Sequence, residues 1–488
     1  MTQQTIQINF TGGIVSPGYL KAILEVAAQA KVTQVRFGLR QQLILDIPLK
    51  NFVMFEAECN SHNIVFFKKK QALPNIVSSY PAAGIFTTDT WLREGVYKDV
   101  FGLFDYTPAL KINICDSTQT LVPLFTGHIN WISSTSTHFW HLFIRFPKTQ
   151  TLYSFPEQIY TNDIATVTKQ LEQLIVGSAT TTGHDLYRHL KETITYISKP
   201  AEKELPLPQF SLPYYEGFNK FEAHYWLGIY RRNESLPISF LLDVCAICSE
   251  TKVGQLYTTP WKSLIIKGIE AKHRPLWDYV LGKYRINVRH AANELNWQVE
   301  DNNEEGLQLK RQIIRHFDKE DVRTYGLCFA VQTQPHSGMF GSVILKKQEV
   351  KNPDKLKTLE RFEIRYSTGF NPNAFETILF RQNVAKEHLG IYLVALSKFF
   401  YEQQKSQHTI LSPTATKDAR QEQLVTKILH QCKHCLTIYD STLGDAGIGI
   451  AAGTTFEEIP DTYCCPLCDA KKEDFVAVEE ASLQLQRT

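Results

Sequence analysis

The sequence predicts an α+β protein in which a duplicated body is followed by a small metal-binding domain. Three features of the 488 residues lead to this prediction. A helix–hairpin pattern occurs twice at an offset of 221 residues, two C-x-x-C motifs lie near the C-terminus, and two polar or proline-rich stretches separate the parts. Since a chain of this length exceeds one core, we expect units at 1–197, 214–401 and 429–488, with linkers at 198–213 and 402–428.

The first copy of the repeat reads as a helix, a hairpin and a second helix. Apolar residues at i, i+3, i+4 and i+7 give the first helix one buried face: Leu20, Ile23, Leu24 and Ala27. Alternating apolar positions then predict two strands, one through 35, 37 and 39 and one through 43, 45 and 47. A second helix is expected over 51–61, and its counterpart in the second copy over 271–282.

The repeat decides how Cys245 and Cys248 are interpreted. Their C-x-x-C spacing could form a redox or metal pair, but the offset of 221 aligns them with Leu24 and Ala27 on the buried face of a helix. Because a buried cysteine behaves as a small hydrophobic residue, core packing is the favoured interpretation. A redox or metal role stays as the alternative.

Four cysteines near the C-terminus form a metal-binding pattern. They make two C-x-x-C motifs separated by 29 residues: Cys432, Cys435, Cys465 and Cys468. Four thiolates in a tetrahedral arrangement suit iron or Zn²⁺, and backbone N–H groups of each C-x-x-C turn can bond to its sulfurs. The spacer is longer than the roughly 15–20 residues typical of zinc sites with two such motifs.

This segment resembles rubredoxin, a small mono-iron electron carrier, over residues 429–478. The matching positions are the C-P-x-C of the second motif and its surroundings: Tyr439-Asp440, Gly444-Asp445, 452–456, 459–461 and Asp474-Phe475. The resemblance implies one iron on the four cysteines, shielded by an aromatic core: Tyr439, Phe456, Tyr463 and Phe475.

Some positions depart from that family. Leu436 and Asp469 stand where glycine is usual, Tyr463 stands where tryptophan is usual, and Cys464 is extra and outside the ligand register. A zinc-loaded structural motif therefore stays as the alternative to iron.

The repeated body resembles the ferredoxin-like half-domains of sirohaem-dependent nitrite and sulfite reductases, over residues 1–400. Short motifs carry this resemblance: Gly12–Gly18 and Arg40-Gln41 in the first copy, 225–229 and 256–260 in the second. It implies that 105–195 and 285–400 are α/β domains and that two such units enclose a sirohaem.

Arg40 and the cysteines of the body indicate which cofactors of that family this chain could bind. In the family, the arginine that matches Arg40 binds a sirohaem carboxylate or an anionic substrate, a role that suits a guanidinium. The favoured alternative is that Arg40 is a strand residue whose side chain is exposed to solvent. The family also binds a four-iron cluster through two cysteine pairs, expected near 290–295 and 326–328, where this chain has Cys328 alone. We therefore expect no four-iron cluster and no reduction of nitrite or sulfite by the family's own mechanism, while sirohaem itself stays open.

Composition and charge exclude several classes of protein. The net charge is +2 and no basic block is interleaved with aromatic residues, so nucleic acid is not an expected partner. No run of about 18 apolar residues predicts a membrane span, and MTQQTIQINF lacks the basic and apolar regions of a signal peptide. The six remaining cysteines show no disulfide framework, which fits a reducing cytoplasm.

These observations predict an electron-transfer protein with a mononuclear Fe(Cys)₄ centre, served by redox partner proteins as donor and acceptor. The resemblance of the body implies nitrite- or sulfite-type reductive metabolism. One alternative is a reductase that carries sirohaem or another cofactor and uses the rubredoxin domain as its built-in donor. Another is a zinc-stabilised binding scaffold without redox function. An electron carrier is favoured over a self-contained enzyme.

Overall fold

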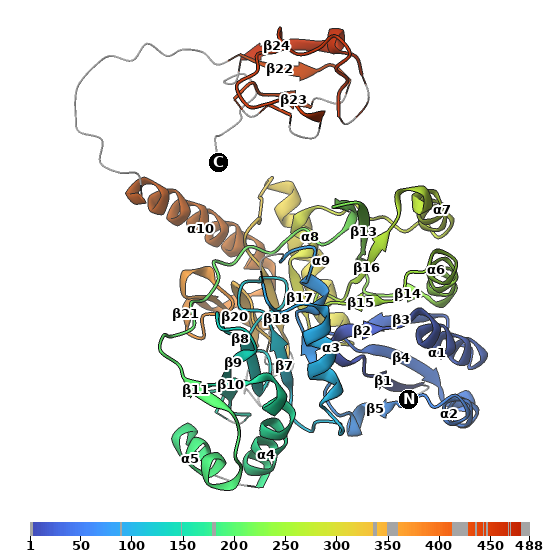
Figure 1. Cartoon of the computed structure of the whole chain (residues 1–488), viewed down its shortest axis with the longest axis vertical. Helices are drawn as coiled ribbons and strands as arrows, with labels where there is room; N and C mark the ends of the chain where they lie inside the picture. Colours follow the sequence, from blue (N-terminus) through green and yellow to red (C-terminus); the bar gives the residue numbers. More distant parts are fainter. Residues whose placement is uncertain are drawn as a thin grey trace. The chain divides into compact units, whose positions relative to one another are not determined.

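The computed structural model forms two compact units, Met1–His408 and Thr409–Thr488 (Figure 1). It describes residues 3–87, 90–147, 149–177, 182–334, 339–348, 360–411, 428–434, 437–442, 444–445, 448–466, 468 and 470–479. The larger unit is a mixed α/β body with four sheets, and the smaller unit has one three-stranded sheet.

The first copy of the repeat folds as a helix-covered antiparallel sheet, as its periodicity predicts. Its strands are β1 (Gln3–Ile8), β3 (Gln34–Phe37), β4 (Leu43–Pro48) and β5 (Phe67–Lys68), and its helices are α1 (Pro17–Gln29) and α2 (Phe52–Ser61). Helix α1 begins at Pro17 because Ser16 caps it, its side chain accepting a hydrogen bond from the Tyr19 N–H. The four apolar residues predicted for its buried face are all buried.

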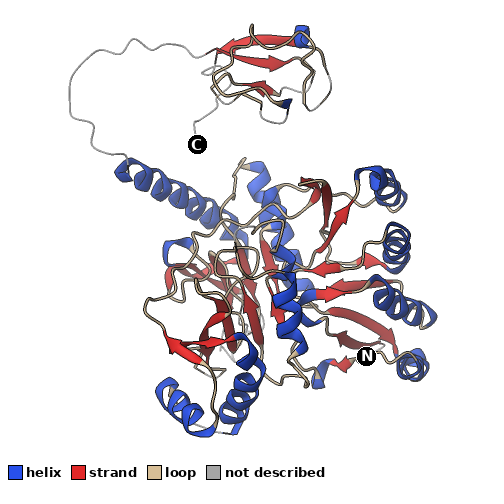
Figure 2. Ribbon diagram, viewed as in Figure 1, coloured by secondary structure: helices blue, strands red, loops and turns tan. Residues whose placement is uncertain are grey.

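The second copy repeats this arrangement. Its strands are β12 (Gly217–Phe221), β13 (His224–Ile229), β15 (Leu256–Thr258) and β16 (Leu264–Ile269), and its helices are α6 (Ile238–Thr251) and α7 (Arg274–Lys283). The hairpin turns correspond even in backbone conformation, with φ of 62° at Gln41 and 56° at Lys262. Helices α1, α2, α6 and α7 lie along one side of these two sheets (Figures 1 and 2).

The two copies exchange short edge strands. Strand β2 (Ile14–Val15) joins the second copy's sheet, where Val15 pairs with Leu256. Strand β14 (Leu236–Pro237) joins the first copy's sheet, where Leu236 pairs with Val35. Val15 and Leu236 are equivalent at the offset of 221, as are Val35 and Leu256, so the exchange is reciprocal. The copies share one hydrophobic core.

Two further sheets follow one pattern, with parallel pairs first and antiparallel pairs afterwards. One contains β6 (Val77–Ser78), β7 (Ile112–Cys115), β8 (Ile129–Ser133), β9 (Phe139–Arg145), β10 (Leu152–Tyr160) and β11 (Ser198–Pro200). The other contains β17 (Trp297–Val299), β18 (Phe329–Gln332), β19 (Val343–Gln348), β20 (Arg361–Ser367) and β21 (Thr377–Ala385).

Helices accompany both of these sheets. They are α3 (Glu94–Gly102), α4 (Ile164–Gly177) and α5 (Gly183–Thr193) in the first half, and α8 (Ala292–Leu295), α9 (Glu304–Lys319) and α10 (Leu389–Leu411) in the second. The α/β segments expected at 105–195 and 285–400 contain most of these elements. No helix in the described ranges combines the length and apolar character needed to cross a membrane.

The first stretch expected to be a linker packs on the body, and the second is described only in part. Within 198–213, β11 pairs with β10 and Leu212 is buried in the body's core. Residues 402–411 continue α10, and 412–427 lie outside the described residues. The domain division proposed from the sequence stays a prediction.

Candidate metal centre

The first predicted ligand lies at the end of a strand in the smaller unit. Strands β22 (Ile428–Cys432), β23 (Ile438–Tyr439) and β24 (Phe475–Glu479) form its sheet, and Cys432 pairs with Phe475. The Cys432 N–H donates to the Thr437 carbonyl at 2.8 Å, which closes the chain around the first C-x-x-C motif. Cys432 is fully buried.

The second motif brings two more thiols to the same place. The buried Cys465 donates its N–H to the Ala470 carbonyl at 2.7 Å, while Cys468 is exposed. The Sγ atoms of Cys432 and Cys468 are 3.6 Å apart, and the three Sγ atoms lie within 4.8 Å of one another. Sulfurs about 2.3 Å from a tetrahedral metal would be about 3.8 Å apart, so the described thiols fit such an ion.

The remaining predicted ligand, Cys435, lies outside the described residues, as do Leu436 and Asp469. Cys464 is exposed and does not belong to the cluster of three thiols; its thiol lies 3.6 Å from the Thr462 carbonyl. The structure therefore brings three of the four predicted ligands together and leaves the extra cysteine outside them.

An aromatic core packs beside the thiols, with the four members expected from the sequence. The ring centroids of Tyr439 and Phe456 are 5.7 Å apart, those of Phe456 and Phe475 are 5.4 Å apart, and those of Tyr463 and Phe475 are 5.7 Å apart. Cys432 and Cys465 belong to the same buried cluster as Tyr439 and Phe475. This core keeps water away from two of the sulfurs.

Two supporting residues were not anticipated from the sequence. His430 stacks on Phe456 with ring centroids 4.0 Å apart. Lys472 donates from Nζ to the carbonyls of Ile459 at 2.6 Å and Glu457 at 3.3 Å, which ties the loop before the second motif to the segment after it. A lysine beside a metal-ligand motif carries no periodic signal, so its role could only be found in the structure.

Arg40 lies in the hairpin turn between β3 and β4, and its guanidinium faces the protein. Its Nη2 donates to the carbonyls of Asn75 and Ile112, both at 2.8 Å, and Nε donates to Asn75 at 3.1 Å. Nη1 lies 3.3 Å from the Asn113 Oδ1. The interpretation as a solvated strand residue is wrong, because the turn folds against segments that are distant in sequence.

Arg40 belongs to a group of four basic side chains that we call the basic cluster: Arg40, Lys111, His128 and Arg145. Burial, together with Arg145, lowers the pKa of Arg40 to about 9. Burial, together with Arg40 and Arg145, lowers the pKa of Lys111 to about 8. Burial also lowers the pKa of Arg145 to about 10. Cations crowded in this way create a positive potential inside the body.

The segments where the resemblance expects cluster ligands are held together by side-chain amides instead. Asn293 donates to the Val322 carbonyl at 2.7 Å, and Asn296 donates to the Leu327 carbonyl at 2.9 Å. The buried Cys328 accepts the Ser342 N–H at 3.3 Å. One thiol among amides cannot bind a cysteine-ligated four-iron cluster, so that group does not fit this body.

The C-x-x-C on α6 is part of the core, as the repeat predicts. Cys245 and Cys248 are both fully buried in the core that the two copies share. Burial raises the pKa of both thiols, which makes them poor nucleophiles and poor metal ligands.

Comparisons with known proteins give a different match for each of the two units. Residues 429–475 match the family model described as Rubredoxin. The chain is 55% identical over 49 residues to Rubredoxin-2 of Ectopseudomonas oleovorans, which is 10% of this chain and 28% of that protein. It is 44% identical over 48 residues to Rubredoxin-2 of Chlorobaculum tepidum, covering 92% of that protein. The chain thus spans less than a third of the length of the first of these relatives.

The body is similar to a solved structure in fold. The NirA protein of Mycobacterium tuberculosis superposes with a TM-score of 0.60, covering 82% of this chain and 81% of that one, at 14% sequence identity. At this identity the similarity concerns the arrangement of helices and strands and not the residues of any site.

Proposed function

We propose, because the chain belongs to the rubredoxin family through residues 429–475, that it is an electron-transfer protein with one iron bound by Cys432, Cys435, Cys465 and Cys468. The observation that carries this proposal is the convergence of three of these thiols beside the aromatic core. Iron in such a site exchanges one electron between Fe³⁺ and Fe²⁺ and keeps its four ligands.

Some residues around the site exclude water from it, and one leaves a sulfur open to a redox partner. Buried Cys432 and Cys465, with Tyr439 and Phe475, exclude water from one side of the site, which limits solvent reorganisation. Cys468 is exposed, so among the three described thiols its sulfur is the one that a redox partner can approach. Backbone hydrogen bonds to the Thr437 and Ala470 carbonyls hold Cys432 and Cys465 in place.

The body supports a role in reductive metabolism of the nitrite or sulfite type, with donor and acceptor proteins as partners. This rests on its fold similarity to the NirA protein and on the duplicated half-domains.

A second candidate function is a reductase that holds sirohaem in its body and receives electrons from the rubredoxin domain. The basic cluster favours it, because clustered, partly buried cations attract the carboxylates of such a cofactor. Arg40 argues against it, since its hydrogen bonds go to protein carbonyls and Asn113. If the four cysteines bound zinc instead of iron, the small unit would have a structural role and would not transfer electrons.

The deciding experiment is a visible absorption spectrum with metal analysis on the full-length protein, expressed with iron supplied and zinc limited. Iron–thiolate bands with one iron per chain are expected. An additional Soret-type band would establish the reductase. Colourless protein with one zinc per chain under these conditions would leave the electron-transfer proposal without support.

A further inference from the structure

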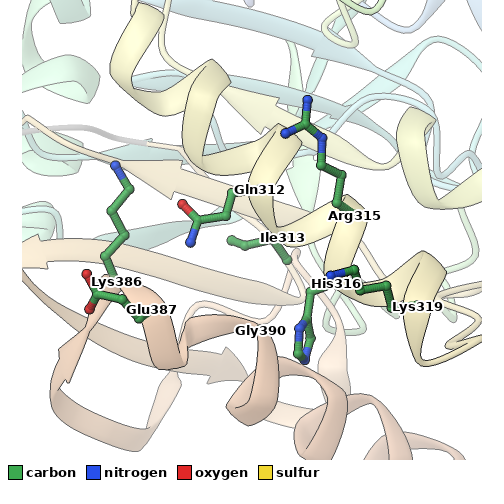
Figure 3. Close-up of a pocket in the computed structure, with 8 residues that line it drawn as sticks. All are labelled: Gln312, Ile313, Arg315, His316, Lys319, Lys386, Glu387 and Gly390. Atoms are coloured by element: carbon green, nitrogen blue, oxygen red, sulfur yellow. The ribbon is translucent and has the colours of Figure 1, made fainter.

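A pocket lies where helix α9 meets the beginning of helix α10 (Figure 3). Its volume is about 260 Å³. Five residues of α9 and three from the start of the α10 segment line it: Gln312, Ile313, Arg315, His316, Lys319, Lys386, Glu387 and Gly390. The pocket is open to solvent on one side and polar along its walls.

The charge of this lining is positive. Arg315, Lys319 and Lys386 contribute three cations, and Glu387 contributes one carboxylate. Among the described residues neither Arg315 nor Lys319 forms an ion pair, and Lys386 is 3.8 Å from Glu360. By contrast Arg311, one turn earlier on α9, pairs with Glu304 at 3.0 Å. Arg315 and Lys319 are thus the pocket cations left without a close carboxylate, while Lys386 shares Glu360 with Lys347, which lies 3.0 Å from it.

Close helix packing shapes the pocket floor. A Cβ atom on Gly390 would lie 2.6 Å from Cγ and Cδ2 of His316, so only glycine lets the imidazole rest against the first turn of α10. His316 is thereby held at the wall, and its ring nitrogens add hydrogen-bonding groups to the cationic side chains.

The duplicated fold supplies an internal comparison. The short helical turn Lys386–His388 before α10 corresponds to Thr161–Asp163 before α4, an offset of 225. At that offset Lys386 is replaced by Thr161, Glu387 by Asn162 and Gly390 by Ala165. The same place in the first half therefore lacks both the cation and the glycine, so the basic pocket is not a requirement of the fold.

We propose that this pocket binds a small phosphate-bearing anion. Among the lining residues three cations and one carboxylate leave an excess of positive charge, which Glu360 beside Lys386 offsets only in part. A phosphate dianion neutralises more of this excess than a monoanion such as chloride or acetate. Guanidinium and ammonium groups are strong hydrogen-bond donors to phosphate oxygens. A volume of about 260 Å³ is far larger than one water and fits inorganic phosphate or a compact phosphate monoester.

Calorimetric titration of the full-length protein with inorganic phosphate tests this proposal, at constant ionic strength with acetate as the comparison anion. Saturable binding of one phosphate per chain is expected, with acetate binding at least tenfold weaker. Arg315→Gln and Lys386→Gln should each weaken phosphate binding at least tenfold, because each removes one of the three cations.

Arg311→Gln is the matched control, since it removes an arginine of the same helix that does not line the pocket. It should leave phosphate affinity unchanged. Circular dichroism and thermal unfolding without phosphate confirm that all variants are folded. Absence of saturable binding would overturn the proposal, as would equal binding of acetate or equal loss of affinity in Arg311→Gln.

Discussion

The Sγ atoms of Cys432 and Cys468 lie 3.6 Å apart although the two residues come from different C-x-x-C motifs. A disulfide would need about 2.05 Å, whereas two ligands of one tetrahedral metal need nearly the observed distance. The separation of these two thiols is therefore the one that a shared metal ion needs, and Cys432 is placed by its pairing with Phe475 in the sheet.

Replacing Cys468 by serine should remove the iron–thiolate absorption and lower iron retention at least tenfold, because a hydroxyl is a much weaker ligand than a thiolate. Metal analysis after dialysis against a chelator measures this. Cys464→Ser is the control and should keep the full iron content. Equal loss of iron in both variants would contradict the assigned ligand set.

Lys472→Met should destabilise the small unit by about 1.5–3 kcal/mol, since a charged donor to the Ile459 and Glu457 carbonyls is lost. The loss of visible absorption during urea unfolding reports on this unit. Lys471→Met removes an exposed lysine 3.9 Å from Glu473 and should change stability by less than about 0.5 kcal/mol. A similar effect of both substitutions would mean that the bonds of Lys472 contribute little.

Arg40→Met should lower the free energy of unfolding of the body by about 2–4 kcal/mol, because the carbonyls of Asn75 and Ile112 lose their donors. Urea unfolding followed by tryptophan fluorescence measures it. Lys98→Met, which breaks an exposed pair with Glu94, is the control and should have little effect. Unchanged stability with loss of a tetrapyrrole band would instead identify Arg40 as a cofactor ligand.

His128 should make the body sensitive to acid. Burial, with Lys111 and Arg145 nearby, lowers the pKa of His128 to about 3 from 6.5. The unfolded chain therefore binds a proton between these pH values that the folded chain does not, so stability falls as the pH drops from 6.5 towards 3. His128 contributes up to about 1.4 kcal/mol per pH unit to that slope.

His128→Asn removes this titration while its amide oxygen can still accept the Lys111 N–H that His128 Nδ1 accepts at 3.2 Å. Unfolding free energies measured from pH 3.5 to 6.5 should show a shallower slope for this variant. His184→Asn, on an exposed histidine, should leave the slope of the original protein. An unchanged slope in His128→Asn would mean that the acid sensitivity arises elsewhere.

The sequence predicted those parts of the fold that depend on the spacing of apolar residues within a short segment. The apolar spacing of Leu20, Ile23, Leu24 and Ala27 defined α1, and the offset of 221 carried that assignment to α6 and placed Cys245 in the core. The aromatic core and three described ligands also followed from spacing and resemblance, because each depends on residues within one short segment.

Other features depend on contacts that no local pattern contains. Strands β2 and β14 are two residues each, too short for any periodicity. The orientation of Arg40 depends on Asn75 and Ile112, and the basic cluster gathers residues from four separate segments. The pocket lined by Arg315 and Lys386 likewise depends on the packing of α9 against the segment at the start of α10, which the sequence does not reveal.

The reciprocal exchange of β2 and β14 also describes how such a body could have arisen. Two identical half-length chains related by a twofold axis would pair Val15 with Leu256, and Leu236 with Val35, as one repeated contact made twice. The body has the arrangement that joining the subunits of such a strand-swapped dimer end to end would give. Joined halves need not stay identical, and here the second half has Lys386 and Gly390 where the first has Thr161 and Ala165.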